Sequence, residues 1–600
     1  MTTFEVWAPA ADRVDVDVGP PGAAVRHPMT AAPDRTGWWR ADVPAAGHGT
    51  DYGFRVDGAG TGLPDDGPLP DPRSRWQPYG VLGRSRVYEH NRFRWHDAGR
   101  RGRPLPGAVL YELHIGTFTP AGTFDAAIDR LDHLVGLGVD FVELLPVAAF
   151  PGRHGWGYDG VHLWSVHDPY GGPDGLKRFV DACHGRGLGV VLDVVYNHLG
   201  PTGNFLGRYG PYFNRAHTTP WGQGINADQP GSDEVRAFVV ENALMWLRDY
   251  HIDGLRLDAV HAIADTRAVH LLEELATAVC GAAAHLGREP FLIAESDLND
   301  PRLITPPEAG GYGLDAQWSD DFHHALHAAL TGERHAYYGD FGSMAALAKT
   351  LTRVFFHDGT YSSFRGRRHG RPVDVTRVPG HRFVGYLQNH DQIGNRATGD
   401  RISDALSAPL LKVGAGLLLT APATPMLFMG EEWGARTPWC FFTDHIDPEQ
   451  ARRVSEGRRA EFAGHGWGGA AADPQDPETY HGSVLDWAEP DKPGHRELLD
   501  WYRALIALRR AHPELTDLRL TEVRVDYDEA ARWLVMTRGR LCVAANLGPQ
   551  PVRLPDLADL PDRPDLADRP DLAGATLLAT HPGVRPPELP ATSFTVFRRS

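Results

Sequence analysis

A repeated alternation of helix-like and strand-like segments is the feature that most constrains the fold of this chain. Four amphipathic stretches are each followed at once by a short apolar run, and these pairs occupy 124–147, 175–197, 234–260 and 266–296. Repeated units of this kind, with apolar strands, predict a parallel sheet that helices cover on both faces. Over residues 106–515 we expect an α/β domain that closes into a (β/α)8 TIM barrel with long loops. An open doubly wound sheet is the alternative, although no G-x-G-x-x-G motif follows any of these strands.

The two ends of the chain have a different texture. Residues 1–105 and 516–600 contain short alternating segments, such as FEVWAP, RVDVDV and RWLVMTR, separated by Gly, Pro and Asp. This pattern is typical of small β-sandwiches, so we expect one sandwich domain on each side of the barrel. The stretch 555–573 is a degenerate repeat rich in Pro and charge, which predicts a mobile loop without a function.

Charge and cysteine content exclude several classes of protein. The formal net charge of −17 disfavours nucleic acid and anionic membranes as partners. The four cysteines are widely spaced and form no C-x-x-C pair, which argues against a disulfide framework or a zinc site and suits a reducing compartment. Neither a signal peptide nor an apolar run of transmembrane length is visible. We therefore expect a cytoplasmic protein with no nucleic-acid or membrane partner.

The strand within HIDGLRLDAVH carries charges that need an explanation, because a buried charge is costly unless it is paired or used. Strand alternation places Leu255, Leu257 and Ala259 on one face, and Arg256 with Asp258 on the other. If the apolar face meets the helices, the charged pair points into the mouth of the barrel, where barrel enzymes carry out catalysis. A purely structural Arg–Asp pair is the alternative reading of this strand taken alone.

Three further strands end in polar residues. The strand at 190–198 delivers Asp193 and Asn197, the strand at 291–296 ends in Glu295, and Asp391 follows the strand that begins at 384. The carboxyl ends of parallel strands meet on one rim of a barrel. Four acids at separate strand ends therefore predict a functional site and disfavour a purely structural explanation.

Four motifs in this order resemble the α-amylase superfamily of glycoside hydrolases: DVVYNH (193–198), GLRLDAVH (254–261), AES (294–296) and QNHDQ (388–392). The resemblance covers the barrel and both flanking sandwiches, and it implies that the N-terminal sandwich is similar to a carbohydrate-binding domain. It implies a retaining glycosidase, in which one carboxylate is the nucleophile and one carboxylic acid is the proton donor. The catalytic residues that it implies are Asp258 as nucleophile, Glu295 as general acid/base and Asp391 as the residue that stabilises the transition state.

The same resemblance implies contacts to the sugar on the non-reducing side of the cleaved bond, the −1 sugar. Tyr158 is expected to form a platform under this sugar, and His198 and His390 to donate to its hydroxyls. The cation of Arg256 favours the ionised nucleophile, and neighbouring acids are expected to keep Glu295 protonated. Asp193 and His261 complete this part of the predicted site. No cofactor and no metal are expected, because no Asp-rich calcium loop accompanies Asn197, where some α-amylases bind calcium.

The resemblance is strongest to the trehalose-releasing enzymes of the superfamily, on the segments 193–206, 318–333, 388–402 and 429–445. Branching enzymes usually carry Ser-His-Asp-Glu where this chain has NHDQ. The implied reaction is hydrolysis of the α-1,4 bond next to the terminal trehalose of maltooligosyltrehalose or a related α-glucan oligosaccharide, which a maltooligosyltrehalose-forming enzyme would supply. The residues expected to recognise the trehalose are Asp320, Asp321, His323, His324, Gln392 and Asn395.

Alternatives remain open at this point. The run DDFHH (320–324), taken alone, reads as a helix start with capping acids. A glycogen branching or debranching enzyme has the same scaffold and would transfer chains or cleave branch points. A non-catalytic glucan-binding protein would be expected to lack one of the three carboxylates, and all three are present.

Overall fold

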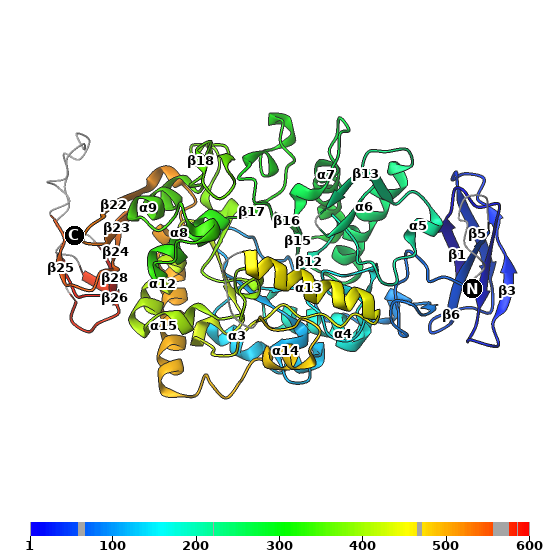
Figure 1. Cartoon of the computed structure of the whole chain (residues 1–600), viewed down its shortest axis with the longest axis horizontal. Coiled ribbons are helices and arrows are strands. Elements are labelled where there is room, and N and C mark those ends of the chain that lie inside the picture. The colour runs from blue at the N-terminus through cyan, green and yellow to red at the C-terminus, as the bar shows by residue number, and fades with distance from the viewer. Residues whose placement is uncertain are drawn as a thin grey trace.

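Three bodies follow one another along the long axis of the computed structural model, which describes residues 2–57, 67–219, 221–464, 471–555, 575–584 and 586–598. Small β-sheets at the N-terminus lie at one end, the helices and strands of a barrel lie in the middle, and the C-terminal sheets lie at the other end (Figure 1). All but the first residue of the predicted loop at 555–573 lies outside the described residues.

Eight parallel strands close into a barrel in the middle of the molecule, which confirms the predicted (β/α)8 fold. Every neighbouring pair runs in parallel, and the strand that begins the barrel also closes it against the last one. In order around the barrel the strands are β8 (Leu110–Leu113), β9 (Phe141–Leu144), β12 (Gly189–Val194), β15 (Gly254–Leu257), β16 (Phe291–Ala294), β17 (Ala316–Trp318), β20 (Phe383–Tyr386) and β21 (Thr424–Phe428).

The lumen of the barrel changes from apolar to polar along the strands. Its floor is a separate cluster of buried side chains that includes Leu110, Phe141 and Val191. Alternation brings the residue two positions further along each strand to the same face. On the same three strands these residues are the buried acids Glu112, Glu143 and Asp193. The lumen is therefore a packed core below and a layer of charged groups at its carboxyl-terminal mouth.

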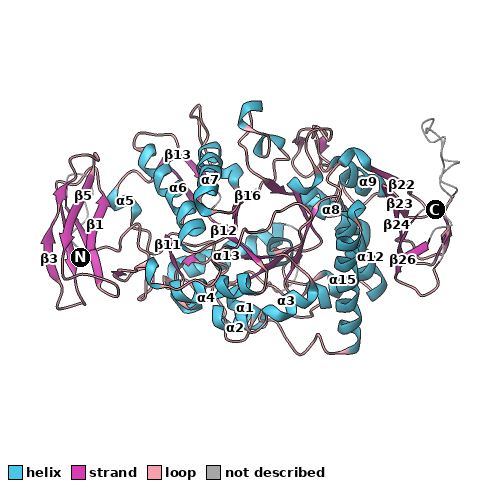
Figure 2. Cartoon of the chain, turned by 180° about the vertical axis from the view of Figure 1, so that it is seen from behind, coloured by secondary structure: helices cyan, strands magenta, loops and turns pink. Residues whose placement is uncertain are grey.

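Helices surround the barrel strands, as the colouring by secondary structure makes visible (Figure 2). They carry the apolar faces that cover the outward side chains of the strands, and one continuous cluster of buried residues joins both layers. The helices of this layer are α2 (Phe124–Ile128), α3 (Leu131–Leu137), α4 (Gly172–Gly185), α6 (Ser232–Asp249), α7 (Leu271–Leu286), α8 (Asp320–Thr331), α9 (Met344–Arg353), α12 (Ala408–Thr420) and α15 (Pro493–Ala511).

Two sheets with apolar inner faces form the N-terminal body. One has the order β1–β5–β4 and the other β3–β2–β6–β7, and their inward residues share a single core. The strands are β1 (Thr2–Trp7), β2 (Arg13–Val18), β3 (Val25–Pro28), β4 (Thr30–Ala31), β5 (Trp38–Val43), β6 (Asp51–Asp57) and β7 (Ser85–Arg86). This arrangement is the expected β-sandwich.

The C-terminal body has a five-stranded sheet of order β22–β23–β24–β28–β26 and a two-stranded sheet of β25 and β27. One face of the larger sheet contacts the barrel, where Phe594 meets Trp501 of α15 at 6.0 Å between ring centroids. Its other face packs with the smaller sheet in a separate apolar cluster. The strands are β22 (Val523–Asp528), β23 (Trp533–Arg538), β24 (Leu541–Asn546), β25 (Val552–Arg553), β26 (Ala575–Ala579), β27 (Glu588–Leu589) and β28 (Ser593–Arg598).

Candidate active site

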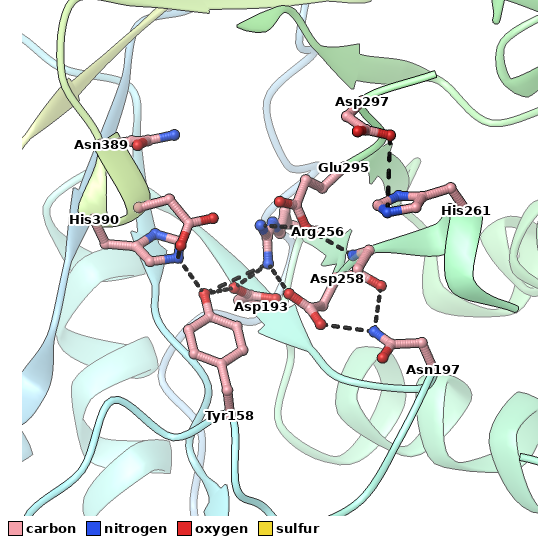
Figure 3. A network of polar contacts seen from close by, with 12 residues as sticks. Tyr158, Asp193, Asn197, Arg256, Asp258, His261, Glu295, Asp297, Asn389 and His390 are labelled. Atoms are coloured by element: carbon pink, nitrogen blue, oxygen red, sulfur yellow. Dashed lines mark hydrogen bonds and ion pairs between the residues drawn. The ribbon is translucent and has the colours of Figure 1, made fainter. Parts of the chain in front are cut away.

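Arg256 lies at the centre of the charged layer at the barrel mouth (Figure 3). Its Nη1 is 2.6 Å from Asp193 Oδ2 and 3.0 Å from Asp258 Oδ1, and its Nη2 is 2.8 Å from Glu295 Oε2. The side chain is completely buried. Burial opposes its charge, but the surrounding carboxylates outweigh this effect and raise the pKa of Arg256 well above its usual value. One cation thus joins acids from three different strands.

The backbone turns sharply just after Asp258. β15 ends at Leu257, and Ala259 adopts a left-handed conformation with a φ of 37°, so the expectation that Ala259 continues the strand is wrong. A left-handed φ is strained for a residue with a side chain. The turn directs the Ala259 N–H to Glu295 Oε2 at 2.7 Å. The turn therefore brings the backbone next to Asp258 into contact with the Glu295 carboxyl group.

Asn197 fixes Asp258 from the opposite side. Its Nδ2 donates to Asp258 Oδ2 at 2.7 Å and to the Asp258 carbonyl oxygen at 2.8 Å. The Asn197 side chain is fully buried, so both contacts are shielded from water. A charge-assisted hydrogen bond of this kind contributes about 1.5–3 kcal/mol. The carboxylate of Asp258 is held in one orientation by Arg256 and Asn197 together.

Glu295 remains partly open to solvent, with a side chain that is 20% exposed. Burial raises its pKa, the charge of Arg256 opposes that rise, and Asp258 adds to it. The neighbouring acid Asp258 raises the pKa of Glu295 in the predicted direction, but burial is the larger cause of the rise. Burial also raises the pKa of Asp193 to about 7. Burial therefore favours the protonated form of both Glu295 and Asp193.

A chain of hydrogen bonds crosses the mouth from β8 to β12. Glu112 Oε1 is 2.6 Å from His390 Nδ1, and His390 Nε2 is 2.8 Å from the hydroxyl of Tyr158. That hydroxyl donates to Asp193 Oδ2 at 2.6 Å. The Tyr158 ring stacks on the His390 ring with centroids 5.3 Å apart and planes 20° apart. The structure thus brings the predicted sugar platform Tyr158 beside His390 and the carboxylate cluster.

A cavity of about 230 Å³ opens beside Glu295 and Asp391. Four of the residues predicted to recognise trehalose line it: Asp320, His324, Gln392 and Asn395. Gln392 Nε2 is 3.4 Å from Asp320 Oδ1, which also accepts a hydrogen bond from Tyr386. Burial raises the pKa of Asp320 to about 7. These four predicted residues therefore share one pocket next to the carboxylate cluster.

Asp321 and His323 do not line this cavity. Asp321 Oδ2 accepts hydrogen bonds from the backbone N–H groups of Phe356 and His357 at 2.7 and 2.8 Å. His323 is buried behind the site, with Nε2 3.0 Å from the Tyr338 hydroxyl, and burial lowers its pKa well below the usual value. In a helix, residues four apart share a face. Asp320 and His324 share the pocket face of α8, whereas Asp321 and His323 point elsewhere.

His198 and His261 lie at the edge of the site. His198 Nε2 is 3.1 Å from the Tyr158 carbonyl oxygen, and its ring stacks on Trp221 at 5.4 Å. Burial lowers the pKa of His198. His261 Nε2 is 3.8 Å from Asp297, which lines the cavity.

Glu112 and Trp318 are absent from the site residues that the sequence predicts, and Asn197, which it predicts at the rim, takes a role that it does not predict. Glu112 binds His390, Asn197 orients Asp258 rather than suggesting a metal, and Trp318 lies under the Arg256 guanidinium with 4.2 Å from Cζ to the ring centroid. A signal existed for Glu112, because the apolar run VLYELHI contains a single acid at an inward position. Trp318 gave no such signal, since aromatic residues in strands are usually core residues.

Within the described part of the chain, no group of three or more His, Cys, Asp or Glu side chains is arranged to hold a metal ion. No helix there is both long and apolar enough to span a bilayer.

A closed parallel barrel whose mouth holds an arginine between two carboxylates defines an α-amylase-type glycoside hydrolase. Family models agree with this class. Residues 88–208 match the Alpha amylase catalytic domain, residues 1–80 match Carbohydrate-binding module 48 (Isoamylase N-terminal domain), and residues 518–596 match a domain of unknown function, DUF3459.

Individual relatives narrow the class further. The malto-oligosyltrehalose trehalohydrolase of Arthrobacter ramosus is 55% identical over 92% of this chain and 94% of its own length. The enzyme of the same name from Rhizobium sp. (strain M-11) is 53% identical over 92% of both chains. A crystal structure from Salmonella typhimurium, attributed to an alpha amylase, matches 100% of this chain and 97% of its own with 38% identity and a TM-score of 0.88. The chain belongs to the malto-oligosyltrehalose trehalohydrolase family.

Proposed function

We propose that this chain is a retaining glycoside hydrolase that cleaves the α-1,4 bond next to the terminal trehalose of maltooligosyltrehalose and releases trehalose. The reaction is suggested by the names of relatives more than 50% identical over nearly the whole chain. The observation that carries the mechanism is the Arg256 guanidinium, which contacts both Asp258 and Glu295. In retaining glycosidases the two carboxyl groups lie only about 5–5.5 Å apart. A single guanidinium bridging two acids requires them to be close neighbours.

Asp258 acts as the nucleophile and Glu295 as the general acid. Asp258 Oδ attacks the anomeric carbon of the −1 sugar, while the Glu295 proton passes to the glycosidic oxygen and trehalose leaves. Glu295, now ionised, takes a proton from a water molecule, which attacks the anomeric carbon and frees Asp258. Burial favours the protonated Glu295 needed in the first step. Arg256 and Asn197 hold Asp258 in the orientation for attack.

Asp391 is proposed to stabilise the distorted, positively charged sugar of the transition state. It follows β20, lines the cavity beside Glu295, and its side chain is 36% exposed. Its Oδ1 lies 3.6 Å from His390 Nε2 and 3.4 Å from Asn395 Nδ2. A carboxylate that faces the cavity is placed to accept hydrogen bonds from sugar hydroxyls and to stabilise the positive charge that develops at the anomeric carbon.

Trehalose is proposed to bind in the cavity of about 230 Å³. The Asp320 carboxyl group and the Gln392 amide lie next to each other and can both form hydrogen bonds to a sugar. His324 stacks on Tyr337 with ring centroids 4.8 Å apart. Gln392 both donates and accepts hydrogen bonds without a charge, which suits a neutral, non-reducing disaccharide. The placement of Asp321 and His323 leaves them as supports for this region and not as contacts to sugar.

We propose that the enzyme works in the cytoplasm on α-glucan oligosaccharides, downstream of an enzyme that forms maltooligosyltrehalose. The four cysteines, all of which lie in the described part of the chain, form no disulfide bond, as in proteins of a reducing compartment. Chromatography of the products is the test of the function. Maltooligosyltrehalose is expected to yield trehalose and a shorter maltooligosaccharide, and the plain maltooligosaccharide is expected to react much more slowly. Equal release of glucose and maltose from both substrates would refute the trehalose assignment, and chain transfer on amylose, seen by iodine staining, would favour a branching enzyme.

A further inference from the structure

We propose that Glu112 is a positioning residue that keeps His390 protonated on both ring nitrogens, so that His390 serves the reaction as a cationic hydrogen-bond donor at the −1 sugar. The inference rests on the proposed glycosidase function and assigns a role to a residue of β8 that lies far in sequence from the four motifs. It follows from the arrangement of donors and acceptors around the His390 ring.

The contact with Glu112 requires a proton on Nδ1. Glu112 is 1% exposed, and each of its two carboxyl oxygens contacts His390. Oε1 is 2.6 Å from Nδ1, and Oε2 accepts a hydrogen bond from the backbone N–H at 3.0 Å. Because Oε2 accepts from the backbone of the same residue, Oε1 is placed to accept from the ring. The geometry therefore assigns the donor role in this short contact to Nδ1.

The contact with Tyr158 requires a proton on Nε2 as well. The Tyr158 hydroxyl has a single proton, which it donates to Asp193 Oδ2 at 2.6 Å. Its oxygen can then only accept from His390 Nε2 at 2.8 Å. Asp391 Oδ1, at 3.6 Å from the same nitrogen, is a second acceptor. With acceptors on both sides, the ring is an imidazolium.

The charges around the ring agree with this protonation state. Burial disfavours the imidazolium, but Glu112 and Asp391 outweigh burial and raise the pKa of His390 to about 9. Arg256 opposes them from β15. Glu143 on β9, Glu295 beyond β16 and His114 beyond β8 also face the ring. Burial raises the pKa of Glu143 well above its usual value and lowers that of His114 to about 3, so burial favours the neutral form of both.

This arrangement gives His390 a function that a neutral ring could not perform. Because Nδ1 is hydrogen-bonded to Glu112, the Nε2–H points toward Tyr158 and Asp391 on the cavity side of the ring. A sugar hydroxyl that enters there can replace one of these acceptors and receive the proton of a charged donor. A hydrogen bond from a charged group is roughly twice as strong as one between neutral groups. Glu112 thus acts on the substrate only through His390.

The chain offers a matched control for Glu112. Glu143 lies opposite it in the β8–β9 register, is also 1% exposed, and neither of its oxygens has a hydrogen-bond partner in the structure. Glu143→Gln deletes a carboxyl group that makes no hydrogen bond to His390, and burial favours its neutral form by raising its pKa well above the usual value. Glu112→Gln instead removes the carboxyl group that contacts His390 Nδ1. Both variants delete a carboxyl group from the same layer of the lumen.

The test compares kcat/KM of the wild type and both variants on maltooligosyltrehalose from pH 5.5 to 8.5. Loss of a partner anion at this distance lowers a histidine pKa by about 1–3 units. A fall of about 2 units from about 9 would leave roughly one tenth of His390 protonated at pH 8, against about nine tenths in the wild type. The ratio of wild-type to Glu112→Gln activity should therefore rise about tenfold between pH 5.5 and pH 8, and the Glu143→Gln ratio should stay constant.

A ratio for Glu112→Gln that does not change with pH would overturn the inference, because a purely structural role predicts a uniform loss. If this variant does not fold, nitrogen-15 NMR of histidine-labelled wild type decides, with the His390 signals assigned through His390→Gln. Two ring N–H groups on His390 at pH 7.5 are expected, and a neutral ring would overturn the inference. The function itself is tested separately by hydrolysis with the wild type, so failure of either idea can be told from failure of the other.

Discussion

Replacing Arg256 with methionine removes the one cation that joins three carboxylates while keeping a long side chain in the lumen. The guanidinium is fully buried and lies 2.6, 3.0 and 2.8 Å from Asp193, Asp258 and Glu295. Removing one partner of a buried ion pair costs about 3–5 kcal/mol, because the remaining charge is left without compensation. For a barrel of roughly 400 residues, with an unfolding entropy of about 0.9 kcal/mol/K, that loss corresponds to a fall of about 3–6 °C in the thermal midpoint.

The loss should depend on pH in a direction that Asp193 sets. The pKa of Asp193 is about 7 in the folded protein and about 3.9 in an unfolded chain. An acid whose folded pKa is raised destabilises the fold as pH rises above the unfolded value, up to the folded pKa. Without Arg256 this pKa rises further, so the extra penalty develops above pH 7, by about 1.4 kcal/mol per pH unit. At pH 5.5 Asp193 is protonated in wild type and variant alike, and the penalty should be about 2 kcal/mol smaller than at pH 8.5.

Thermal unfolding followed by circular dichroism at pH 5.5 and pH 8.5 measures this difference. Arg236→Met is the control, because Arg236 is equally buried and pairs with Asp265 at 2.6 Å outside the site. Both variants should lower the midpoint, but only Arg256→Met should also reduce kcat/KM, by about 100-fold or more, since both proposed catalytic carboxylates lose their shared anchor. The reasoning fails if Arg256→Met lowers the midpoint equally at both pH values, or if its kcat/KM stays within threefold of wild type.

Two further predictions concern the roles of individual acids. Glu295→Gln is expected to lower kcat by about 10²–10⁴-fold, with an unchanged circular dichroism spectrum, because the proton donor is lost. Near-normal turnover of this variant would exclude Glu295 as the general acid. In the same way, near-normal hydrolysis by Asp258→Ala would exclude Asp258 as the nucleophile. Asp320→Asn should raise KM for maltooligosyltrehalose more than it lowers kcat, because the side chain lines the proposed trehalose cavity. Asp321→Asn should mainly lower the thermal midpoint. Equal KM values for the two variants in steady-state kinetics would contradict these different roles.

Local pattern was sufficient to predict the fold and the main acids of the site. The repeated helix–strand pairs between 124 and 296 predicted the barrel, because parallel strands that are covered on both faces read as nearly continuous apolar runs. Strand alternation predicted that Arg256 points inward, and the structure places it there among Asp193, Asp258 and Glu295. The period of two is a property of the strand itself, so it needs no knowledge of the rest of the chain.

Contacts between distant segments were beyond the reach of local pattern. Glu112 and His390 are 278 residues apart, and only closure of β21 against β8 brings their ends of the chain together. The same holds for α8, where the sequence offered DDFHH as one recognition run. Which of these side chains face the cavity depends on the rotation of the helix against the barrel, which packing of the whole domain decides.

The sequence by itself determined that the chain forms a parallel barrel with acids at its mouth, because alternation acts within each strand. Only the tertiary structure decided the environment and orientation of those acids, since burial, the contact of Glu295 with Arg256 and the contact of Asp258 with Asn197 all depend on different strands coming together. The left-handed turn at Ala259 is of the same kind. A strained backbone is held in place by its surroundings, and those surroundings exist only once the barrel has closed.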